Sequence, residues 1–173
     1  MNASHSPSAK VWILGSSLYS AHLAAAIGRP YAFASHFAPG DLLDAIEIYR
    51  REFRPSPALD RPHVMVGVPF VAAASDEEAQ RLSTTMILRS LGILRGRRSA
   101  LLPPVEQVEA SPAERAALAE RMALFVVGGP ARVAEGFQQI LDATQADELI
   151  LVSETYDRAA RRESFRIAAS LRD

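Results

Sequence analysis

The sequence predicts an α/β fold in which parallel strands are joined by crossover helices. Short apolar runs rich in β-branched and aromatic residues alternate with longer stretches of helical period, and this alternation is typical of successive βα units. The chain has 173 residues, which suffices for one domain but falls short of the roughly 250 residues of a complete eight-fold α/β barrel. We therefore expect one domain with fewer units than a closed barrel.

Four strands are predicted from apolar runs, at Val11–Leu14, Tyr31–Ser35, His63–Ala73 and Glu148–Ser153. The third run is almost continuously apolar, as expected of a strand that is covered on both faces. Pro69 interrupts this run and has no backbone N–H to donate. It therefore predicts a bulge or an early end of the strand.

Six helices are predicted in the segments that follow the strands, over residues 20–27, 39–53, 76–94, 111–122, 130–144 and 157–171. Gly28 and Pro30 provide the stop signal of the first helix. Ser111 is expected to cap the fourth helix, with Pro112 at its first position. Gly128-Gly129-Pro130 is interpreted as the start of the fifth helix by the same logic.

The stretch Arg95–Pro104 is basic and then proline-rich, which predicts a loop. Together with the helix at 111–122 it forms an inserted helical excursion before the last crossover helix. The arginines at 89, 95, 97 and 98 would form a phosphate trap only if they converge, and the alternative is a solvated helix end.

Composition narrows the class of protein. The formal net charge is −1, so no global field draws the chain to nucleic acid or to an anionic membrane. The absence of cysteine excludes disulfides, thiolate metal sites and cysteine nucleophiles. Residues 1–10 read as a flexible leader without the features of a secretory signal, and no apolar run is long enough for a membrane helix. We expect a soluble, cytoplasmic protein.

The best candidate ligand site is the stretch Gly15, Ser16, Ser17, Leu18, Tyr19 and Ser20. It lies where the first strand passes into the first helix, so backbone N–H groups, the helix dipole and hydroxyls can converge on an anion. We predict a phosphate site there. In the alternative interpretation, Ser16, Ser17 or Ser20 merely caps the helix.

His36 is the candidate catalytic residue. It follows the second strand on the carboxyl side, where barrels and open α/β sheets place their ligands. Histidine can hydrogen-bond a ligand or transfer a proton near neutral pH. Its structural alternative is to cap the loop before Pro39. Glu154 and Tyr156 follow the fourth strand on the same side, and for Tyr156 an exposed loop aromatic is the alternative.

No metal site is predicted. His5, His22 and His63 do not have the spacing of a local metal motif, either with one another or with a carboxylate. The sequence also has no Gly-x-Ser-x-Gly nucleophile elbow.

Two blocks of sequence carry a resemblance to a known family. The first comprises Val11–Ser17, Gly28, Pro30, Ala32–Ala34 and His36–Pro39, and it looks like the fifth and sixth βα units of the luciferase-like monooxygenases. The second comprises Val126–Pro130, Asp147–Val152 and Asp157–Arg161, and it is similar to the last crossover, the eighth strand and the final helix of that family. With Val71–Ala73 and Asp76–Ala79, the resemblance covers nearly all of the chain after residue 10.

The resemblance implies the carboxy-terminal half of a (β/α)8 barrel over residues 11–173. It also implies that the Ser16–Ser20 turn holds the phosphate of FMN, and that the intact enzyme uses reduced FMN and dioxygen to oxygenate a small organic substrate. A deazaflavin in place of FMN is the cofactor alternative. The first four strands would come from elsewhere, so we expect a homodimer or a pairing with the amino-terminal half. The functional alternatives are a non-catalytic half-barrel subunit that binds flavin or phosphate weakly, and an unrelated open α/β phosphate-binding domain.

Overall fold

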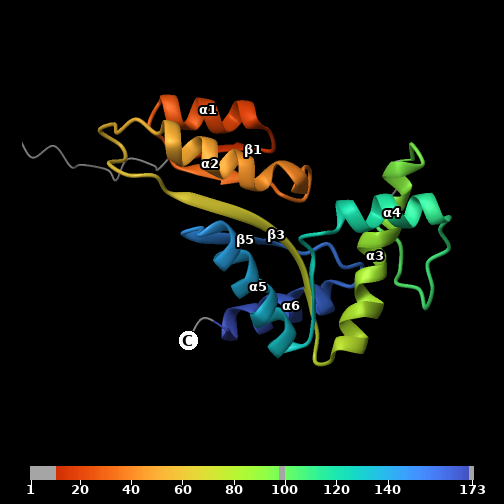
Figure 1. The fold of residues 1–173 in the computed structure, drawn as a ribbon. Coiled ribbons are helices and arrows are strands. Elements are labelled where there is room, and N and C mark those ends of the chain that lie inside the picture. The colour runs from red at the N-terminus through yellow and green to blue at the C-terminus, as the bar shows by residue number, and fades with distance from the viewer. Residues whose placement is uncertain (1–10, 98–99, 172–173) are drawn as a thin grey trace, which may run out of the picture.

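The structure is a computed structural model that describes residues 11–97 and 100–171. Within these ranges the chain forms a sheet of parallel strands flanked by helices (Figure 1), which confirms the predicted α/β class. The predicted leader over residues 1–10 lies outside the described residues.

The sheet has five strands, namely β1 (Ile13–Gly15), β2 (Tyr31–Phe33), β3 (Val64–Ala72), β4 (Val126–Gly128) and β5 (Glu148–Val152). All strand pairs are parallel, and β3 is central because it pairs with three other strands. Its residues 64–66 pair with β2, 65–69 with β5 and 70–72 with β4, while β2 also pairs with β1. The order along the main path is β1-β2-β3-β4.

The prediction of four strands is wrong by one, because Val126–Gly128 forms β4. This strand has three residues and runs directly into the helix-start residues Gly129 and Pro130, so it carries almost no local signal. It exists because its residues pair with Phe70–Ala72 at the end of β3, a contact made far away in the sequence.

The prediction of a bulge or an early end at Pro69 is also wrong, since β3 continues to Ala72. Pro69 pairs in register with Val152 of β5. The pairing of β2 with β3 has already ended at Val66, so one edge of β3 has no strand-pairing bond at position 69 that a missing N–H would break.

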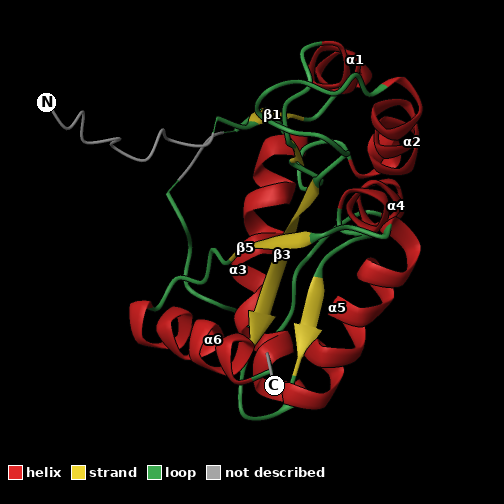
Figure 2. Cartoon of the chain, turned by 90° about the vertical axis from the view of Figure 1, so that its left-hand side faces the viewer, coloured by secondary structure: helices red, strands yellow, loops and turns green. Residues whose placement is uncertain are grey.

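The helices are α1 (Leu18–Ala26), α2 (Leu42–Glu52), α3 (Asp76–Leu94), α4 (Pro112–Arg121), α5 (Pro130–Thr144) and α6 (Arg158–Ser170), with a short 3-10 turn η1 (Pro39–Asp41) before α2. All six predicted helices are confirmed within a few residues. The predicted cap of α4 is present as a capping box, in which Ser111 and Glu114 exchange side-chain to backbone hydrogen bonds. Figures 1 and 2 show α1 and α2 at one end of the molecule and α5 and α6 at the other, with β3 between them.

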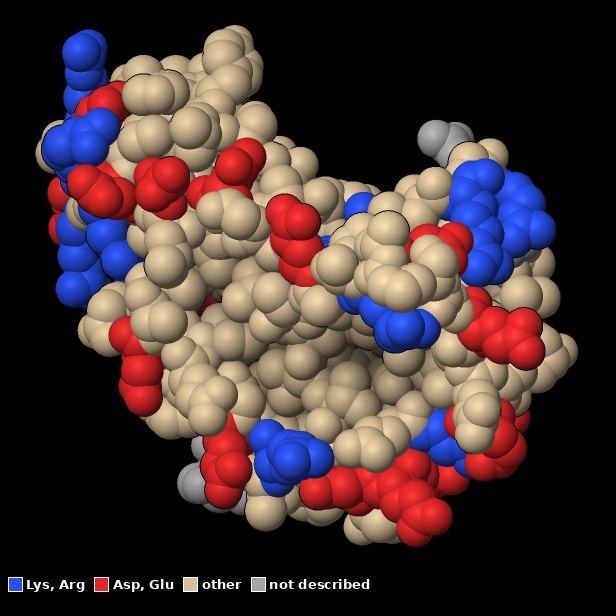
Figure 3. All heavy atoms as spheres, turned by 45° about the vertical axis from the view of Figure 1, so that its right-hand side comes forward, with Lys and Arg blue, Asp and Glu red and all other residues tan. Residues whose placement is uncertain are grey.

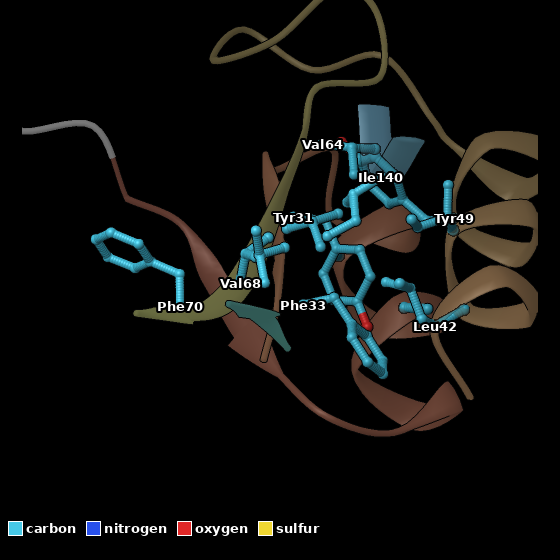
Figure 4. Close-up of a cluster of buried hydrophobic side chains, with 14 of the residues drawn as sticks. Tyr31, Phe33, Leu42, Tyr49, Val64, Val68, Phe70 and Ile140 are labelled. Atoms are coloured by element: carbon cyan, nitrogen blue, oxygen red, sulfur yellow. The ribbon is translucent and has the colours of Figure 1, made fainter. Parts of the chain in front are cut away.

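One face of the sheet packs against the helices and forms the core (Figure 4). Its buried side chains include aromatic and branched residues of β2 and β3 together with residues of α2 and α5: Tyr31, Phe33, Val64, Val68, Phe70, Leu42, Tyr49 and Ile140. Burial of one such large apolar side chain contributes roughly 1.5–3 kcal/mol. Burial on this face therefore contributes strongly to the stability of the domain.

The opposite face of the sheet is covered only in part. At the carboxyl end of β3, Val71 forms a second buried cluster with Leu82 and Met86 of α3, whereas the rest of this face is open. Leu14 and Met65 share one row across β1 and β3, and Ile150 of β5 points to the same side because side chains alternate along a strand. Leu14 is 67% exposed and Ile150 is 47% exposed. Among the described residues, β1 pairs only with β2 and β5 only with β3, so two parallel edges flank this open face.

The inserted excursion between β3 and α5 is anchored on α3. The Thr85 hydroxyl donates to the carbonyl oxygen of Leu102 (2.9 Å), and the backbone N–H of Val105 donates to the Thr84 hydroxyl (2.9 Å). An ion pair joins Arg95 to Glu114 at the start of α4 (2.7 Å). These bonds hold α4 beside α3, next to the sheet in Figure 1.

Candidate functional site

The carboxyl ends of β1 and β2 bring the predicted site residues to one edge of the sheet. The backbone N–H of Ala34 donates to the carbonyl oxygen of Gly15 (2.8 Å), so the turn after β1 lies beside the loop after β2. His36 in that loop packs against β3, where a β-carbon added to Gly67 would lie 3.6 Å from the imidazole Nδ1. The predicted phosphate turn and the predicted catalytic residue therefore occupy neighbouring loops.

The turn after β1 is held in shape by hydrogen bonds that point into the interior. The Ser20 hydroxyl donates to the carbonyl oxygen of Ser17 (2.6 Å) and shares a hydrogen bond with the Tyr31 hydroxyl (2.9 Å). A side chain on Gly15 would overlap the Ser20 hydroxyl. Burial raises the pKa of the Tyr31 phenol, and the hydrogen bond with Ser20 opposes this rise. Ser20 therefore shapes the turn, and its hydroxyl faces the interior.

The outer side of the same turn is rich in open hydrogen-bond donors. Ser17 is the N-cap of α1 in extended conformation, yet its side chain makes no capping bond, and within residues 11–97 and 100–171 the hydroxyls of Ser16 and Ser17 have no protein partner. The N–H groups of Leu18 and Tyr19 lie in the first helical turn, where no acceptor within the helix exists. Together with the positive end of the α1 dipole, these donors form a cradle that suits an anion.

A small pocket of about 110 Å³ opens beside His36. Its apolar lining comes from the strand ends, from α3 and from the excursion: Phe37, Pro69, Met86, Ile93, Phe125 and Val152. Its charged residues are Arg89, Arg121 and Glu154. The Arg89 Nη1 lies 2.6 Å from the Glu154 Oε1, so these two charges compensate each other. In the part of the chain that the structure describes, Arg121 has no ion-pair or hydrogen-bond partner, which leaves one uncompensated positive charge at the pocket.

His36 is held neutral by its surroundings. Burial lowers the pKa of His36 below its ordinary value, the Glu154 carboxylate opposes this effect, and the Arg121 guanidinium adds to it. The imidazole Nδ1 is buried and lacks a hydrogen-bond partner among the described residues. A proton on Nδ1 would bury an unpaired N–H donor, which proteins avoid more strictly than an unpaired acceptor. The tautomer with its proton on Nε2 is therefore favoured.

Of the other predicted polar groups, Arg89 and Glu154 line the pocket as an ion pair, and the remaining ones lie elsewhere. Arg89 pairs with Glu154 and Arg95 with Glu114, so these arginines do not converge into a phosphate trap, while position 98 lies outside the described residues. Tyr156 is 51% exposed and does not line the pocket.

The remaining described histidines have carboxylate partners away from the site. His22 lies 2.6 Å from Glu52, and His63 lies 2.7 Å from Glu148, whereas His5 is outside the described residues. Across residues 11–97 and 100–171, no three His, Asp or Glu side chains gather in a way that would hold a metal ion. None of the described helices combines the length and the apolar character needed to cross a membrane.

A larger cleft of about 640 Å³ lies on the helix side of the sheet, between η1, the segment 123–127 and α5. Figure 3 shows this hollowed face, with mostly uncharged walls and charged side chains around the rim. The cleft contains no predicted site residue. It meets the pocket beside His36 at Phe125, which lines both. We place the candidate site at the smaller pocket, because that pocket lies at the carboxyl ends of the strands.

Sequence reasoning missed Arg121 and Phe125 as members of the site. Arg121 is the last residue of α4, and Phe125 precedes β4, so both come from the excursion. Neither position carries a local motif. Only the docking of α4 and β4 onto the sheet brings them to His36.

Comparison with known proteins gives a consistent picture. A family model described as luciferase-like monooxygenase matches residues 2–148. The uncharacterized protein YvbT of Bacillus subtilis is 44% identical over 163 residues, covering 93% of this chain and 48% of that protein. A luciferase-like monooxygenase of Escherichia coli K12 is 41% identical over 165 residues, covering 94% and 49%. The chain thus spans about half the length of these relatives.

Solved structures agree with this result. The crystal structure of apo-MsnO8 superposes with a TM-score of 0.85 at 31% sequence identity, covering 98% of this chain and 52% of the other. The oxygenating constituent of 3,6-diketocamphane monooxygenase from Pseudomonas putida, solved in complex with FMN, has a TM-score of 0.53 at 19% identity, with coverage of 91% and 46%. The latter likeness concerns the fold alone.

Proposed function

The chain belongs to the luciferase-like monooxygenase family, and on that premise we propose that it is the phosphate-binding half of an FMN-dependent monooxygenase. One observation carries the proposal. The turn after β1 presents two N–H groups at the start of α1 and two serine hydroxyls that have no hydrogen-bond partner among the described residues. A phosphate monoester accepts several charge-assisted hydrogen bonds, and these donors suit it.

In this proposal, the turn after β1 binds the phosphate and the loop after β2 carries His36. Ser16, Ser17 and the backbone of Leu18 and Tyr19 hold the phosphate, while Ser20 keeps the turn in shape from the inside. When bound, reduced flavin supplies the oxygen chemistry. The protein contributes position, hydrogen bonds and exclusion of water.

His36 would act as a hydrogen-bond donor to the reacting centre. Its lowered pKa keeps the imidazole uncharged, and the favoured tautomer presents Nε2–H. A neutral Nε2–H can stabilise a developing negative oxygen by donating a hydrogen bond, but it keeps its proton, because an imidazolate would be too basic to form. We therefore propose that His36 acts as a hydrogen-bond donor beside the flavin.

The barrel would be completed from outside these 173 residues. The sheet has two parallel edges, and its open face carries the exposed side chains of Leu14 and Ile150. Exposed edges and apolar patches of this kind favour pairing. We propose that β1, β2, β3 and β5 are the fifth to eighth strands of a (β/α)8 barrel, and that an amino-terminal half-barrel covers the open part of the sheet and supplies the rest of the flavin and substrate pocket.

A flavin titration tests the phosphate assignment. The Ser17→Ala variant is expected to bind FMN about tenfold more weakly than the wild type, because one charge-assisted hydrogen bond is lost, and to bind riboflavin unchanged. Ser170→Ala serves as the matched control, since that serine lies on α6 and bonds only to the carbonyl oxygen of Ile167 (2.8 Å). Flavin fluorescence provides the readout. Equal losses for FMN and riboflavin, or no FMN binding at millimolar concentration, would contradict the assignment.

The second candidate function is a non-catalytic half-barrel that pairs with its own copy. The same open face and free edges favour it, because self-complementary surfaces tend to associate symmetrically. Mass in solution, measured with and without FMN, separates the two candidates. A stable dimer that does not bind FMN would favour the non-catalytic subunit.

A further inference from the structure

The pocket beside His36 contains a charge that phosphate binding at the β1 turn does not use. Arg121 lines this pocket at the end of α4, and its guanidinium is close enough to His36 to affect the protonation of the imidazole. The phosphate turn is not part of the pocket lining. The pocket thus offers a positive group to a second molecule or to a second part of the bound one.

We infer that the pocket beside His36 binds a small anionic group of the substrate, a carboxylate or a sulfonate, and that Arg121 is the residue that recognises it. The inference deepens the proposed function and depends on it only in identifying the bound molecule as the substrate. The binding of the anion itself requires no flavin.

Arg121 is assigned this role because the other arginine of the pocket is already engaged. Arg89 forms its ion pair with Glu154 at 2.6 Å, and Arg121 has no such partner among the described residues. Arg121 is half-buried and borders Phe125 and Met86, so water screens its charge incompletely. An unpaired charge in such surroundings gains more from an anionic ligand than a fully solvated one does.

The size and the walls of the pocket limit the ligand further. A volume of about 110 Å³ corresponds to roughly four water molecules, so a carboxylate or sulfonate with a few carbon atoms fills it. Phe37 and Ile93 are exposed at the pocket, where they can contact an apolar remainder of the substrate. His36 also lines the pocket and adds a polar group to these walls.

A matched pair of small ligands tests the inference on the chain without flavin. Butyrate and butyramide have nearly the same shape and differ in charge. Binding is followed by the NMR signals of the His36 ring, which are identified by their loss in the His36→Gln variant. The wild type is expected to bind butyrate at least about tenfold more tightly than butyramide, because only the former makes a charge-assisted pair. Butyrate should also raise the pKa of His36.

Two substitutions of Arg121 at the end of α4 test whether this residue binds the carboxylate. Arg121→Met is expected to lose the preference for butyrate, and Arg121→Lys to keep part of it. Arg115→Met is the control, since Arg115 is exposed on the same helix and its guanidinium bonds to the carbonyl oxygen of Ala110. Circular dichroism verifies that each variant is folded. If butyrate binds Arg121→Met as tightly as the wild type, or if neither ligand perturbs His36 at millimolar concentration, the inference is overturned.

The anion could also be the flavin phosphate, and one further titration distinguishes the two sources. If Arg121→Met weakens FMN but not riboflavin, Arg121 holds the flavin phosphate and the substrate inference is wrong. If FMN fails to bind at all but the butyrate preference and its loss in Arg121→Met are seen, the anion pocket stands and the proposed flavin function fails. The two claims can therefore fail separately.

Discussion

The two faces of the sheet differ sharply although they belong to the same strands. On the helix side, Tyr31, Phe33 and Val66 are completely buried, whereas on the other side Leu14 is 67% and Ile150 47% exposed. Side chains alternate along each strand, so the difference arises from what covers each face. The chain thus has its main core on one side. The other side is covered only where α3 packs at the carboxyl end of β3, and its open part is where we propose that ligands and the remaining strands sit.

The largest expected change in the free energy of unfolding comes from comparing one substitution on each face of the sheet. Phe33→Ala should lower the free energy of unfolding by about 3–5 kcal/mol, because it leaves a cavity in the covered core. Leu14→Ala, on the open face of the neighbouring strand, should lower it by less than about 0.5 kcal/mol. Urea denaturation measures both values. Similar losses would mean that the open face is covered in solution, for example by a second copy.

The next largest loss of stability is expected in the turn between β1 and α1. Gly15→Ala should cost about 1–3 kcal/mol, because the new β-carbon would overlap the Ser20 hydroxyl. Gly40→Ala is the control, since nothing lies within 4 Å of the added β-carbon there. The melting temperatures of the two variants provide the comparison. A Gly15→Ala variant as stable as Gly40→Ala would show that the turn is looser than the structure indicates.

A smaller difference in stability is expected between substitutions on the inner and the outer side of the same turn. Ser20→Ala should cost about 1 kcal/mol of stability, because it removes the bonds to Ser17 and Tyr31. Ser17→Ala should change stability by only a few tenths of a kcal/mol, because its hydroxyl caps nothing. Denaturation curves for both variants, set beside their FMN titrations, give the readout. The reverse order of stabilities would contradict the described hydrogen bonding.

The smallest effect is the pH dependence that His36 contributes at the open side. The pKa of His36 is lowered in the folded state, so below about pH 6.5 the unfolded state takes up a proton that the folded state does not yet bind. Stability therefore falls as the pH drops from the unfolded pKa toward the folded one. His36→Gln should reduce this slope, and melting temperatures between about pH 7 and pH 5 measure it. Identical slopes in variant and wild type would exclude the effect.

Local signals predicted much of this molecule. Ser111 with Pro112 marked the start of α4, and the apolar run from His63 marked the central strand. The failures occurred where long-range pairing overrides local propensity. β4 has three residues and depends on the end of β3, and Pro69 is tolerated because one edge of β3 is unpaired there.

In the candidate site, too, some features were predictable from the sequence and others were not. The position of the Gly15–Ser20 turn and of His36 after their strands followed from the sequence, because strand and helix signals lie next to them in the chain. The inward direction of the Ser20 hydroxyl, and the arrival of Arg121 and Phe125 beside His36, did not. These depend on side-chain packing and on the docking of the excursion.

By itself the sequence determined the α/β class, the order of the helices and the position of the serine-rich turn between β1 and α1, because these properties depend on neighbours in the chain. Only the tertiary structure decided how far each face of the sheet is covered, which serine hydroxyl faces the interior and which arginine of the pocket has no ion-pair partner among the described residues. Those outcomes depend on contacts between segments that are distant in sequence, and no local pattern encodes them.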